Sequence, residues 1–452
     1  MSNRDRTSLK LLTEFLMRRI YEMAEIQPFE ALRYDLGQVG DLSDVIAPPY
    51  DVIDPAMQDR LYKQHPCNVV RVDLNRTEPD DASDQDRYTR AAKYFKQWQQ
   101  DGVLTREHEN AIYVYHQEFD WEGRHYVRKG FIGRLKLEEF GQGKVFPHEQ
   151  TMSGPKMDRL LLTRACQANL SPVFGLYPDA DNLTQAPLEE AILTLTPVVA
   201  TDYLGVTHRL WPVTDQAVIS EVQELMREKP VFIADGHHRY ETSLNYRREL
   251  AERGELSANS PANGVLMMFV SMEDTGLAIL PTHRLVSGLP SLTSEELQDV
   301  LKSNFEFEAA ASAEEAWELM AADGSQDLFG LGTPSDGKWF LARATDTSPM
   351  ALRAPDQSEE WRGLGVSLLN KLILEHLICG RYPNAMPTFK YPHLMEEVVS
   401  AVGEKACQLA CLVNPAQIGH VRDIASKLEK MPPKSTFFYP KLLTGLVFHT
   451  LT

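Results

Sequence analysis

The sequence predicts an α+β fold with a mixed sheet and more than one module. The chain has 452 residues, of which 43% are hydrophobic and 24% are charged, which is an ordinary globular composition. At about 150 residues per domain, this length suggests two or three domains. Helical and strand-like patterns interleave without the regular alternation of a TIM barrel or a Rossmann sheet. These observations together favour several α+β modules.

The first 22 residues form a basic segment whose apolar residues follow a helical spacing. The segment lacks the apolar stretch and the small-residue cleavage site of a signal peptide, and Asp5 and Glu14 are atypical of a transit peptide. An ordinary surface helix and a start codon assigned too far upstream both remain open. We therefore interpret residues 1–22 as an N-terminal extension without a role in the function.

The next part of the chain is extended and rich in turns. Residues 29–52 end in Ala47-Pro48-Pro49-Tyr50-Asp51, where two prolines restrict the backbone and so hold the side chains of Tyr50 and Asp51. Residues 86–100 are predicted to form a helix that stops before Gly102. Residues 111–119 and 125–137 alternate apolar and polar side chains around Asp120-Trp121-Glu122-Gly123, which predicts an antiparallel hairpin.

A strand, a turn and a helix follow in the middle of the chain. Residues 214–229 have a helical pattern that Pro230 ends, and the apolar residues 231–234 predict a short strand. Asp235-Gly236 predicts a turn, and residues 237–250 have helix-forming character. Residues 264–272 and 277–286 are predicted to be two further strands.

The last third mixes helices and strands. Thr293 with Glu296 and Ser312 with Glu315 have the spacing of capping boxes, and polar residues near 331–358 suggest a module boundary. Helices are expected at 361–379 and 417–430, with a strand at 409–413. We expect an N-terminal α+β module at 23–215 that contains the hairpin, a second module at 216–345 and a C-terminal helical and mixed module at 346–452.

Composition narrows the class of protein. The formal net charge is −18, which argues against non-specific nucleic-acid binding, and no apolar run reaches the ~18 residues of a membrane span. Five cysteines are few and odd in number, which is typical of reduced thiols in an intracellular protein. We therefore expect a cytoplasmic protein that binds neither nucleic acid nor membrane, and the sequence leaves an oligomer open.

The turn at Asp235-Gly236 has the features of an anion site. Backbone N–H groups at a helix N-terminus, together with the helix dipole, hold phosphate, and Gly236 lets the ligand approach the backbone. His237, His238 and Arg239 add donors in the first turn, although cations oppose the helix dipole unless an anion lies between them. A buried histidine and a surface arginine at a plain helix start are the structural alternative.

Other polar clusters are weaker signals. His148-Glu149-x-Thr151 precedes Lys156 and Arg159, in a stretch where Glu149 is a candidate general base and the two cations are candidate phosphate ligands. Thr282-His283-Arg284 and Lys434-Ser435-Thr436 are similar polar clusters, and a solvated loop is the alternative for each.

Several sequence motifs are absent. The sequence contains no GxxxxGK[ST], no GxGxxG after a strand, no HExxH and no CxxC. A metallohydrolase site could be built from Asp235, His237, His238, His148 and His283, but adjacent histidines on a helix rarely bind one ion.

Five motifs in order resemble one known family. They are Ala47-Pro48-Pro49-Tyr50-Asp51-Val52, Pro147-His148-Glu149-x-Thr151, Ala234-Asp235-Gly236-His237-His238-Arg239-Tyr240, Leu280-Pro281-Thr282-His283-Arg284 and Met431-Pro432-Pro433-Lys434-Ser435-Thr436. Together they resemble family 1015 of the domains of unknown function (DUF1015), from about Ala24 to His449. The family itself leaves the function open.

One motif also resembles an enzyme. Asp-Gly-His-His-Arg is similar to the phosphate-binding signature of the free-serine kinases in the ParB/sulfiredoxin-like superfamily. This resemblance implies a ParB/sulfiredoxin-like phosphate-binding core with a large inserted α+β portion, because the stretch from Asp51 to Asp235 is far longer than in the small kinases. It further implies that Gly236 to Arg239 bind phosphate and that Asp235 orients the site or a metal.

The resulting hypothesis is a phosphotransferase that moves phosphate from a nucleotide such as ATP or ADP, or from polyphosphate, to a small hydroxyl metabolite such as free serine. Mg²⁺ would bridge the phosphates, with Asp235 or Glu149 as a ligand. A nucleotide-binding switch without turnover and a phosphohydrolase at the same site are the alternatives. The expected catalytic residues are Glu149, Asp51, Asp235 and His237; the phosphate-binding residues are Gly236, His237, His238, Arg239, Lys156 and Arg159; and the substrate-binding residues are Tyr50, His148, Thr282, His283, Arg284, Lys434 and Ser435. We expect these groups to converge on one cleft.

Overall fold

The computed structural model describes residues 24–149 and 153–452, which divide into two compact units. Within the described residues, unit 1 comprises 24–147, 153–277 and 440–452, and unit 2 comprises 148–149 and 278–439. The predicted boundaries at 215/216 and 345/346 therefore fall inside unit 1 and unit 2, so the units do not coincide with the predicted modules. The predicted extension at 1–22 and Thr151 lie outside the described residues.

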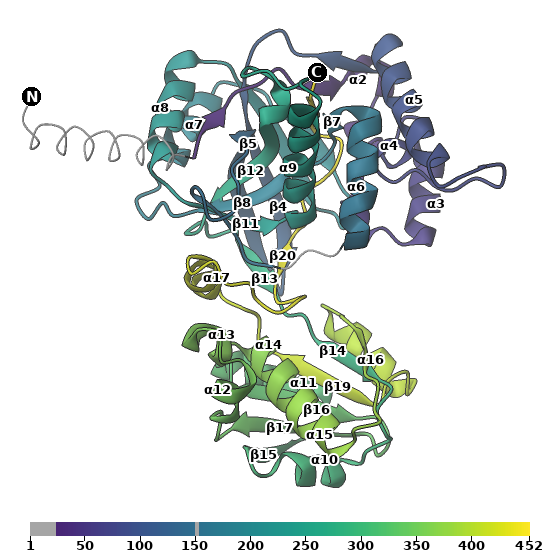
Figure 1. The fold of residues 1–452 in the computed structure, drawn as a ribbon, viewed down its shortest axis with the longest axis vertical. Coiled ribbons are helices and arrows are strands. Elements are labelled where there is room, and N and C mark those ends of the chain that lie inside the picture. Colours follow the sequence, from purple (N-terminus) through teal and green to yellow (C-terminus); the bar gives the residue numbers. More distant parts are fainter. Residues whose placement is uncertain (1–23, 150–152) are drawn as a thin grey trace, which may run out of the picture. The chain divides into compact units, whose positions relative to one another are not determined.

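Unit 1 is built around a nine-stranded mixed sheet (Figure 1). Its β6–β11 and β8–β12 pairs are parallel, and the other pairs are antiparallel. The strand order is β6 (Val145–Pro147), β11 (Val231–Asp235), β8 (Val173–Tyr177), β12 (Gly264–Ser271), β5 (Arg124–Lys136), β4 (Ile112–Trp121), β10 (Thr207–Val213) and β9 (Val198–Thr201), and β1 (Ile26–Gln27) pairs with β5. The mixed sheet confirms the predicted α+β class.

The predicted hairpin is the β4–β5 pair. Trp121 lies opposite Arg124, so the loop has only two residues. Glu122 and Gly123 both have positive φ, at 48° and 73°. Two consecutive residues with positive φ form the turn whose twist matches the twist of paired strands, which is why the register is tight here.

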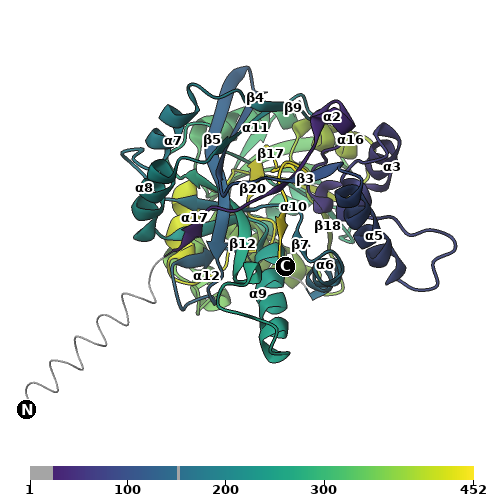
Figure 2. The same cartoon turned by 90° about the horizontal axis from the view of Figure 1, so that it is seen from above.

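Helices cover both sides of this sheet. Figures 1 and 2 show α7 (Gln185–Ile192) and α8 (Gln216–Arg227) on one side, and α5 (Asp86–Gln100), α6 (Ser153–Cys166) and α9 (His237–Glu252) on the other. Buried Val231 and Ile233 of β11 belong to the main hydrophobic core of unit 1. Shorter elements complete the unit: α2 (Leu36–Val39), α3 (Pro55–Gln64), α4 (Val70–Asp73), the 3-10 turns Leu42–Asp44, Tyr50–Val52 and Pro261–Asn263, and the strand pairs β2 (Leu32–Tyr34) with β3 (Leu104–Arg106) and β7 (Ala168–Asn169) with β21 (His449–Thr450).

Unit 2 contains a six-stranded antiparallel sheet and a separate strand pair. The sheet order is β15 (Phe305–Ala310), β17 (Lys338–Ala344), β16 (Leu328–Thr333), β19 (Leu409–Val413), β14 (Arg284–Ser287) and β18 (Thr388–Lys390), while β13 (Ala278–Leu280) pairs with β20 (Phe437–Tyr439). Its helices are α10 (Ser294–Leu301), α11 (Ala313–Asp323), α12 (Pro349–Arg353), α13 (Glu359–Gly363), α14 (Gly365–Ser367), the π-helix Leu368–Ile378, α15 (Cys379–Arg381), α16 (Met395–Gly403) and α17 (Ile418–Ala425).

Two predictions in this region were wrong. The strand expected at 277–286 is two strands in different sheets, β13 and β14, because Pro281 lacks the N–H group that a continuous ladder needs. The polar stretch near 331–358 is not a boundary, since β16 and β17 form a hairpin within the sheet of unit 2. The capping box of Thr293 and Glu296 is confirmed.

Within residues 24–149 and 153–452, no helix has the length and apolar character needed to cross a membrane. The five cysteines are free thiols, as predicted.

Candidate functional site

The Asp-Gly turn forms the strand, turn and helix start that the sequence predicts. β11 ends at Asp235, Gly236 adopts the left-handed conformation with φ 88° and ψ 27°, and α9 begins at His237. Because its N-cap residue is a glycine, α9 has no side-chain cap for the N–H groups of its first turn. A Cβ atom at Gly236 would lie 2.9 Å from Nε of Arg239. Glycine is therefore needed here both for the backbone and for the approach of Arg239.

We expect Gly236→Ala to destabilise the protein by about 1–2 kcal/mol, because the left-handed conformation is costly for a residue with a Cβ atom. It should also displace the Arg239 guanidinium and weaken the binding of pyrophosphate, measured by calorimetry. Gly254→Ala is the matched control, since Gly254 has φ 70° but nothing within 4 Å of its added Cβ atom. Equal effects of both variants on pyrophosphate binding would contradict this assignment.

Asp235 lies between two cations. Its Oδ1 accepts a hydrogen bond from Nη2 of Arg239 at 3.0 Å, and its Oδ2 accepts one from Nζ of Lys441 at 2.6 Å. Burial favours the neutral form of the carboxyl group, but Lys441 and Arg239 more than offset it, so the pKa of Asp235 lies below its ordinary value. The carboxylate is therefore ionised and holds two cations at the N-terminus of α9.

Further contacts fix the Arg239 guanidinium. The Nη1 atom of Arg239 donates a hydrogen bond to the backbone oxygen of Pro172. The backbone oxygen of Arg239 accepts a hydrogen bond from the Ser243 hydroxyl at 3.1 Å. The Arg239 side chain is only 10% exposed. The group is thus oriented before any ligand binds, which lowers the entropic cost of gripping an anion.

A second ion cluster surrounds Arg159 on α6. Its Nη1 donates to the carboxylate of buried Asp73 at 3.1 Å, and its Nε donates to Asp158 at 2.8 Å. The guanidinium lies 4.0 Å from the centre of the Tyr50 ring. Burial and the charge of Asp51 raise the pKa of Tyr50 to about 12, with Arg159 and Arg239 acting in the opposite direction. Tyr50, exposed Asp51, Arg159 and Arg239 therefore share one electrostatic environment in unit 1.

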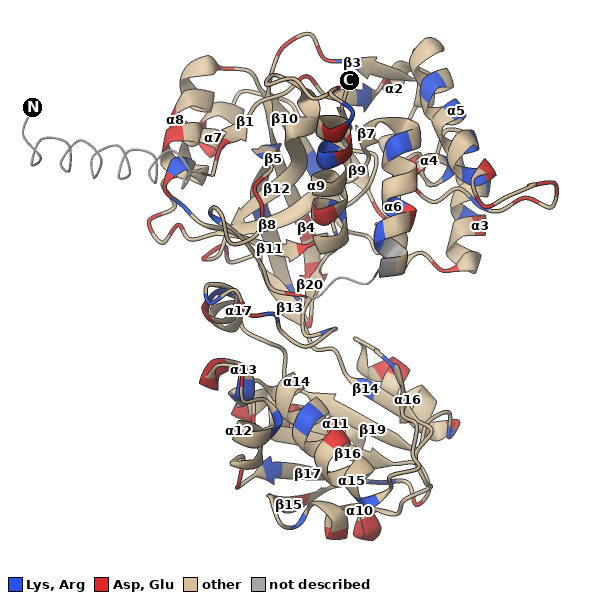
Figure 3. Cartoon of the chain, viewed as in Figure 1, with Lys and Arg blue, Asp and Glu red and all other residues tan. Residues whose placement is uncertain are grey.

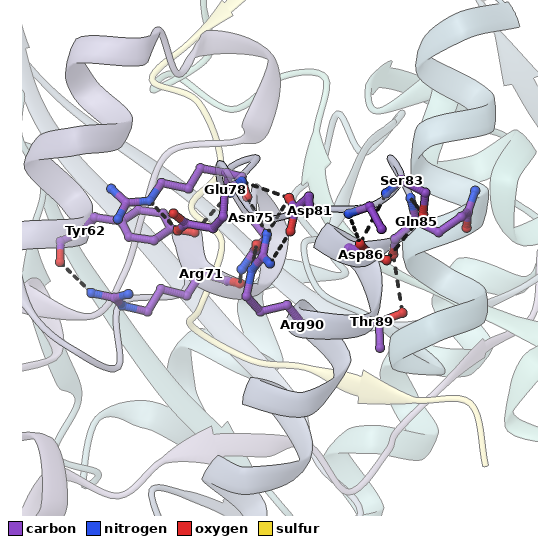
Figure 4. Close-up of polar contacts among 12 residues, drawn as sticks. Tyr62, Arg71, Asn75, Glu78, Asp81, Ser83, Gln85, Asp86, Thr89 and Arg90 are labelled. Atoms are coloured by element: carbon purple, nitrogen blue, oxygen red, sulfur yellow. Dashed lines mark hydrogen bonds and ion pairs between the residues drawn. The ribbon is translucent and has the colours of Figure 1, made fainter.

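Arg90 holds the loop that follows Asp73 (Figure 4). Its Nη1 and Nη2 donate to the two carboxylate oxygens of Asp81 at 2.6 and 3.0 Å, and its Nε donates to Asn75 at 2.8 Å. On the other flank of this loop, Arg71 donates to the backbone oxygen of Tyr62 at 2.7 Å. These contacts tie the end of α4, where Asp73 lies, to α3 and α5.

Because of the Arg90–Asp81 contacts, we expect the stability of the folded protein to decrease in acid. The hydrogen bonds from Arg90 lower the pKa of Asp81 to about 2, so its stabilising effect is present above the unfolded pKa near 4 and is lost as the pH falls towards 2. We expect the wild-type melting temperature to decline over this window more steeply than that of Asp81→Asn. Parallel melting curves for the two proteins between pH 5 and pH 2 would contradict the expected role of Asp81.

A small cavity of about 30 Å³ lies beside Arg239. Among its lining side chains, the Oδ2 of Asp73 and the hydroxyl of Thr242 are buried without a hydrogen-bond partner among the described residues. Burial raises the pKa of Asp73, which Arg159 and Arg239 partly offset. A cavity of this size and polarity has room for an ordered water molecule.

The other predicted residues of unit 1 occupy mixed positions. His237 is buried and its charge contributes to lowering the pKa of Asp235, while His238 is half-buried. Nζ of Lys156 pairs with Glu241 of α9 at 2.9 Å. Lys156 is therefore engaged in an ion pair between α6 and α9, and Figure 3 shows acidic and basic residues mixed along α9.

The remaining predicted residues gather in unit 2. The Oε1 of Glu149 accepts a hydrogen bond from the backbone N–H of Lys434 at 3.1 Å, and Nε2 of His148 lies 2.9 Å from the Thr436 hydroxyl. Nη2 of Arg284 donates to the backbone oxygen of Lys434 at 2.9 Å. Three predicted motifs that are far apart in sequence therefore meet in this unit, with Lys434 and Thr436 of one contacting residues of the other two.

Several of these groups are buried within unit 2. Nδ1 of His283 accepts from the backbone N–H of Val413 at 3.3 Å, and burial lowers the pKa of His283 to about 3. Thr282 and Arg284 are also buried, and the hydroxyl of Ser435 donates to the backbone oxygen of Pro432 at 2.6 Å. The structure thus groups the predicted residues into two sets, one in each unit, and their convergence on a single cleft stays a prediction.

Sequence reasoning missed three residues of the unit 1 site. Lys441 pairs with Asp235 from 206 positions away, Asp73 pairs with Arg159, and buried Arg128 donates to the backbone oxygen of Pro440. No local pattern marks Lys441 or Asp73. A buried arginine on a predicted strand was the one usable signal, because such a charge needs partners.

The described residues lack a cluster of side chains that would bind a metal ion tightly. No group of three or more His, Cys, Asp or Glu side chains in the described part of the chain is placed to hold a metal ion. Both oxygens of Asp235 already face cations, so this carboxylate does not fit the expected role of a Mg²⁺ ligand.

The fold and site define an α+β protein with a cation-rich helix terminus. The chain belongs to the family described as "Protein of unknown function (DUF1015)", whose profile matches residues 26–367. No curated protein matches the chain.

Solved structures show a weak similarity to the chain. A free serine kinase mutant in complex with ADP is 12% identical, covers 67% of this chain and 89% of its own, and has a TM-score of 0.34. A conserved hypothetical protein from Pyrococcus furiosus is 14% identical with a TM-score of 0.32, covering 66% of this chain and 89% of its own. C-terminally truncated SbnI from Staphylococcus aureus is 11% identical with a TM-score of 0.32, covering 67% and 83%.

Proposed function

We propose that the protein is a phosphotransferase that moves phosphate from a nucleotide such as ATP or ADP, or from polyphosphate, to a small hydroxyl metabolite such as free serine. The observation that carries this proposal is the convergence of Arg239 and Lys441 on Asp235 at the uncapped N-terminus of α9. Two cations face one carboxylate, and the helix dipole adds further positive potential. Such a site favours an anion with several oxygens, and phosphate matches it.

The residues of unit 1 suggest how the donor would be held. Phosphoryl transfer depends on positioning and on neutralising charge rather than on covalent catalysis. Arg239 would grip the transferred group, with Asp235 and the backbone oxygen of Pro172 orienting its guanidinium. Gly236 would let the phosphate approach the first turn of α9, where His237 and His238 lie.

Two carboxylates are candidates for the general base. As the acceptor oxygen forms its bond to phosphorus, its O–H bond breaks and the proton passes to a carboxylate, while the bond from phosphorus to the leaving nucleotide breaks. Asp51 is exposed in unit 1, beside Tyr50 and in the environment of Arg159 and Arg239. Glu149 belongs to unit 2, where it accepts a hydrogen bond from Lys434. These positions favour Asp51 as the base.

The test is incubation of the full chain with ATP, ADP or pyrophosphate and a panel of small hydroxyl metabolites, followed by mass spectrometry of the acceptors. We expect one acceptor, with serine the first choice, to gain a phosphate only when a donor is present. Donor hydrolysis that no acceptor changes would instead indicate a phosphohydrolase. Nucleotide binding without any turnover would indicate a regulatory switch, and either result would overturn the kinase assignment.

A further inference from the structure

The segment around Pro440 and Lys441 is held by buried polar side chains. Nη2 of Arg128 donates to the backbone oxygen of Pro440, and Nε2 of Gln117 donates to the backbone oxygen of Lys441 at 3.1 Å. Gln117 also accepts a hydrogen bond from Nε of Arg128 at 3.0 Å. Both side chains come from the central hairpin, Gln117 from β4 and Arg128 from β5. The backbone at Pro440 and Lys441 is therefore anchored to the centre of the sheet.

This anchor is costly for the fold. Gln117 and Arg128 have no exposed surface, and burial lowers the pKa of Arg128 to about 10. A buried guanidinium disfavours folding unless its partners compensate for lost hydration. An apolar pair on these strands would pack the core without that cost. What the polar pair adds is a fixed position for residues 440 and 441.

The fixed position places one ammonium group at the candidate phosphate site. Nζ of Lys441 lies 2.6 Å from Oδ2 of Asp235, and the Lys441 side chain is 17% exposed, so it is sheltered but still reachable from solvent. One ionised carboxylate faces both Lys441 and Arg239, so the three groups together carry one excess positive charge. Neutralising Asp235 alone would require only one of the two cations.

We infer that Lys441 is a phosphate-binding residue of this site and that Gln117 and Arg128 position it, an inference that rests on the proposed function. The ammonium group would contact a phosphate oxygen of the donor while it keeps its contact with Asp235. Lys441 lies outside the motifs that suggested the function, and it reaches the site only because the end of the chain returns to unit 1. The alternative is that Lys441 only stabilises the half-buried carboxylate of Asp235.

The experiment is calorimetric titration of the full chain with pyrophosphate and with ADP. We expect Lys441→Met to weaken both affinities by about 10- to 100-fold, as expected for a lost hydrogen bond between charged groups, and Lys441→Arg to restore most of the loss. Lys136→Met is the matched control, because Lys136 forms an ion pair with Glu25 in the same unit at 2.7 Å, close to the 2.6 Å between Lys441 and Asp235. Its affinities should match the wild type.

Gln117→Glu tests the positioning role. This variant keeps an oxygen acceptor for Arg128, replaces the donor to the backbone of Lys441 with a second oxygen, and adds a buried negative charge that faces the Arg128 guanidinium. Alone it should weaken pyrophosphate binding several-fold. In the Lys441→Met background it should cause no further loss, because residues that act through one contact are not additive. Additive losses would overturn the positioning role.

The remaining outcomes distinguish a wrong role for Lys441 from a wrong proposed function. If folded Lys441→Met binds pyrophosphate within twofold of the wild type, Lys441 has only a structural role, and the proposed function then rests on Arg239 and the N-terminus of α9 alone. If the wild type binds neither pyrophosphate nor any nucleotide, both fall. Should Lys441→Met not fold, acetylation of the wild type read by mass spectrometry decides: pyrophosphate must slow the labelling of Lys441 but not of Lys136, and equal labelling rates overturn the inference.

Discussion

Arg239→Lys is expected to lower turnover by about 100- to 1000-fold while weakening nucleotide binding only a few-fold. Lysine keeps the positive charge but cannot form the planar fork that arginine presents to two oxygens at once. The fork matters most in the transition state, where charge is spread over the equatorial oxygens of the moving phosphoryl group. The measurement is steady-state kinetics with the donor and acceptor that the screen identifies, together with calorimetry for nucleotide binding.

Arg247→Lys is the control for this experiment. Arg247 lies on the same helix, but its guanidinium donates to the backbone oxygen of Leu137 and to Glu139 rather than contacting Asp235. We expect its kinetics to match the wild type, and both variants must first show an unchanged melting temperature. If Arg239→Lys loses nucleotide affinity while its turnover is unchanged, the residue contributes only uniform binding, and the assignment of Arg239 to the transition state is wrong.

The second large effect is expected from the general base. Asp51→Asn should lower the rate of phosphate transfer by about 100- to 10,000-fold and leave nucleotide affinity unchanged, because the amide cannot accept the proton of the acceptor hydroxyl. Glu149→Gln should have a smaller effect, since its carboxylate already accepts the Lys434 N–H group. Single-turnover rates for both variants make the comparison.

Asp59→Asn provides the control, because Asp59 is an exposed carboxylate of unit 1 that forms a long ion pair of 3.5 Å with Arg76. Full activity of Asp51→Asn combined with loss of transfer in Glu149→Gln would move the base to Glu149. Full activity of both variants would remove general-base catalysis by these carboxylates from the proposal.

Local features of the fold were predictable because neighbouring residues determine them. The helix at 86–100, the hairpin and the strand–turn–helix at Gly236 each follow from a pattern within about 30 residues of sequence. The strand at 409–413 also lies where its apolar run predicts. In each case the hydrophobic pattern and the turn residues indicate the same structure.

Glycine was misleading in unit 2. Residues near 331–358 suggested a boundary because they contain glycine, proline and serine, yet Gly332 lies inside β16. A Cβ atom there would lie 2.6 Å from the Trp339 ring of the paired strand. This glycine makes room for a large neighbour instead of forming a turn, and a single sequence does not distinguish the two roles.

The site was only partly predictable, because its partners come from distant parts of the chain. The Asp-Gly-His-His-Arg segment marks Asp235 and Arg239, which are four residues apart on one turn. Asp73 and Lys441 join the site through long-range packing that leaves no periodic pattern in the sequence. Long-range packing also explains why the predicted modules differ from the units, since residues 440–452 return to unit 1 after residues 278–439 form unit 2.

The most direct test of the central claim is a phosphorus NMR time course of the wild-type chain with ADP or ATP and the preferred hydroxyl metabolite. If phosphate is transferred, a new phosphomonoester resonance grows as the resonance of the donor's terminal phosphate declines, and the gain in one integral equals the loss in the other. The Arg239→Lys variant should show no such growth over the same period. Growth of inorganic phosphate alone, or spectra that do not change, would contradict a phosphotransferase.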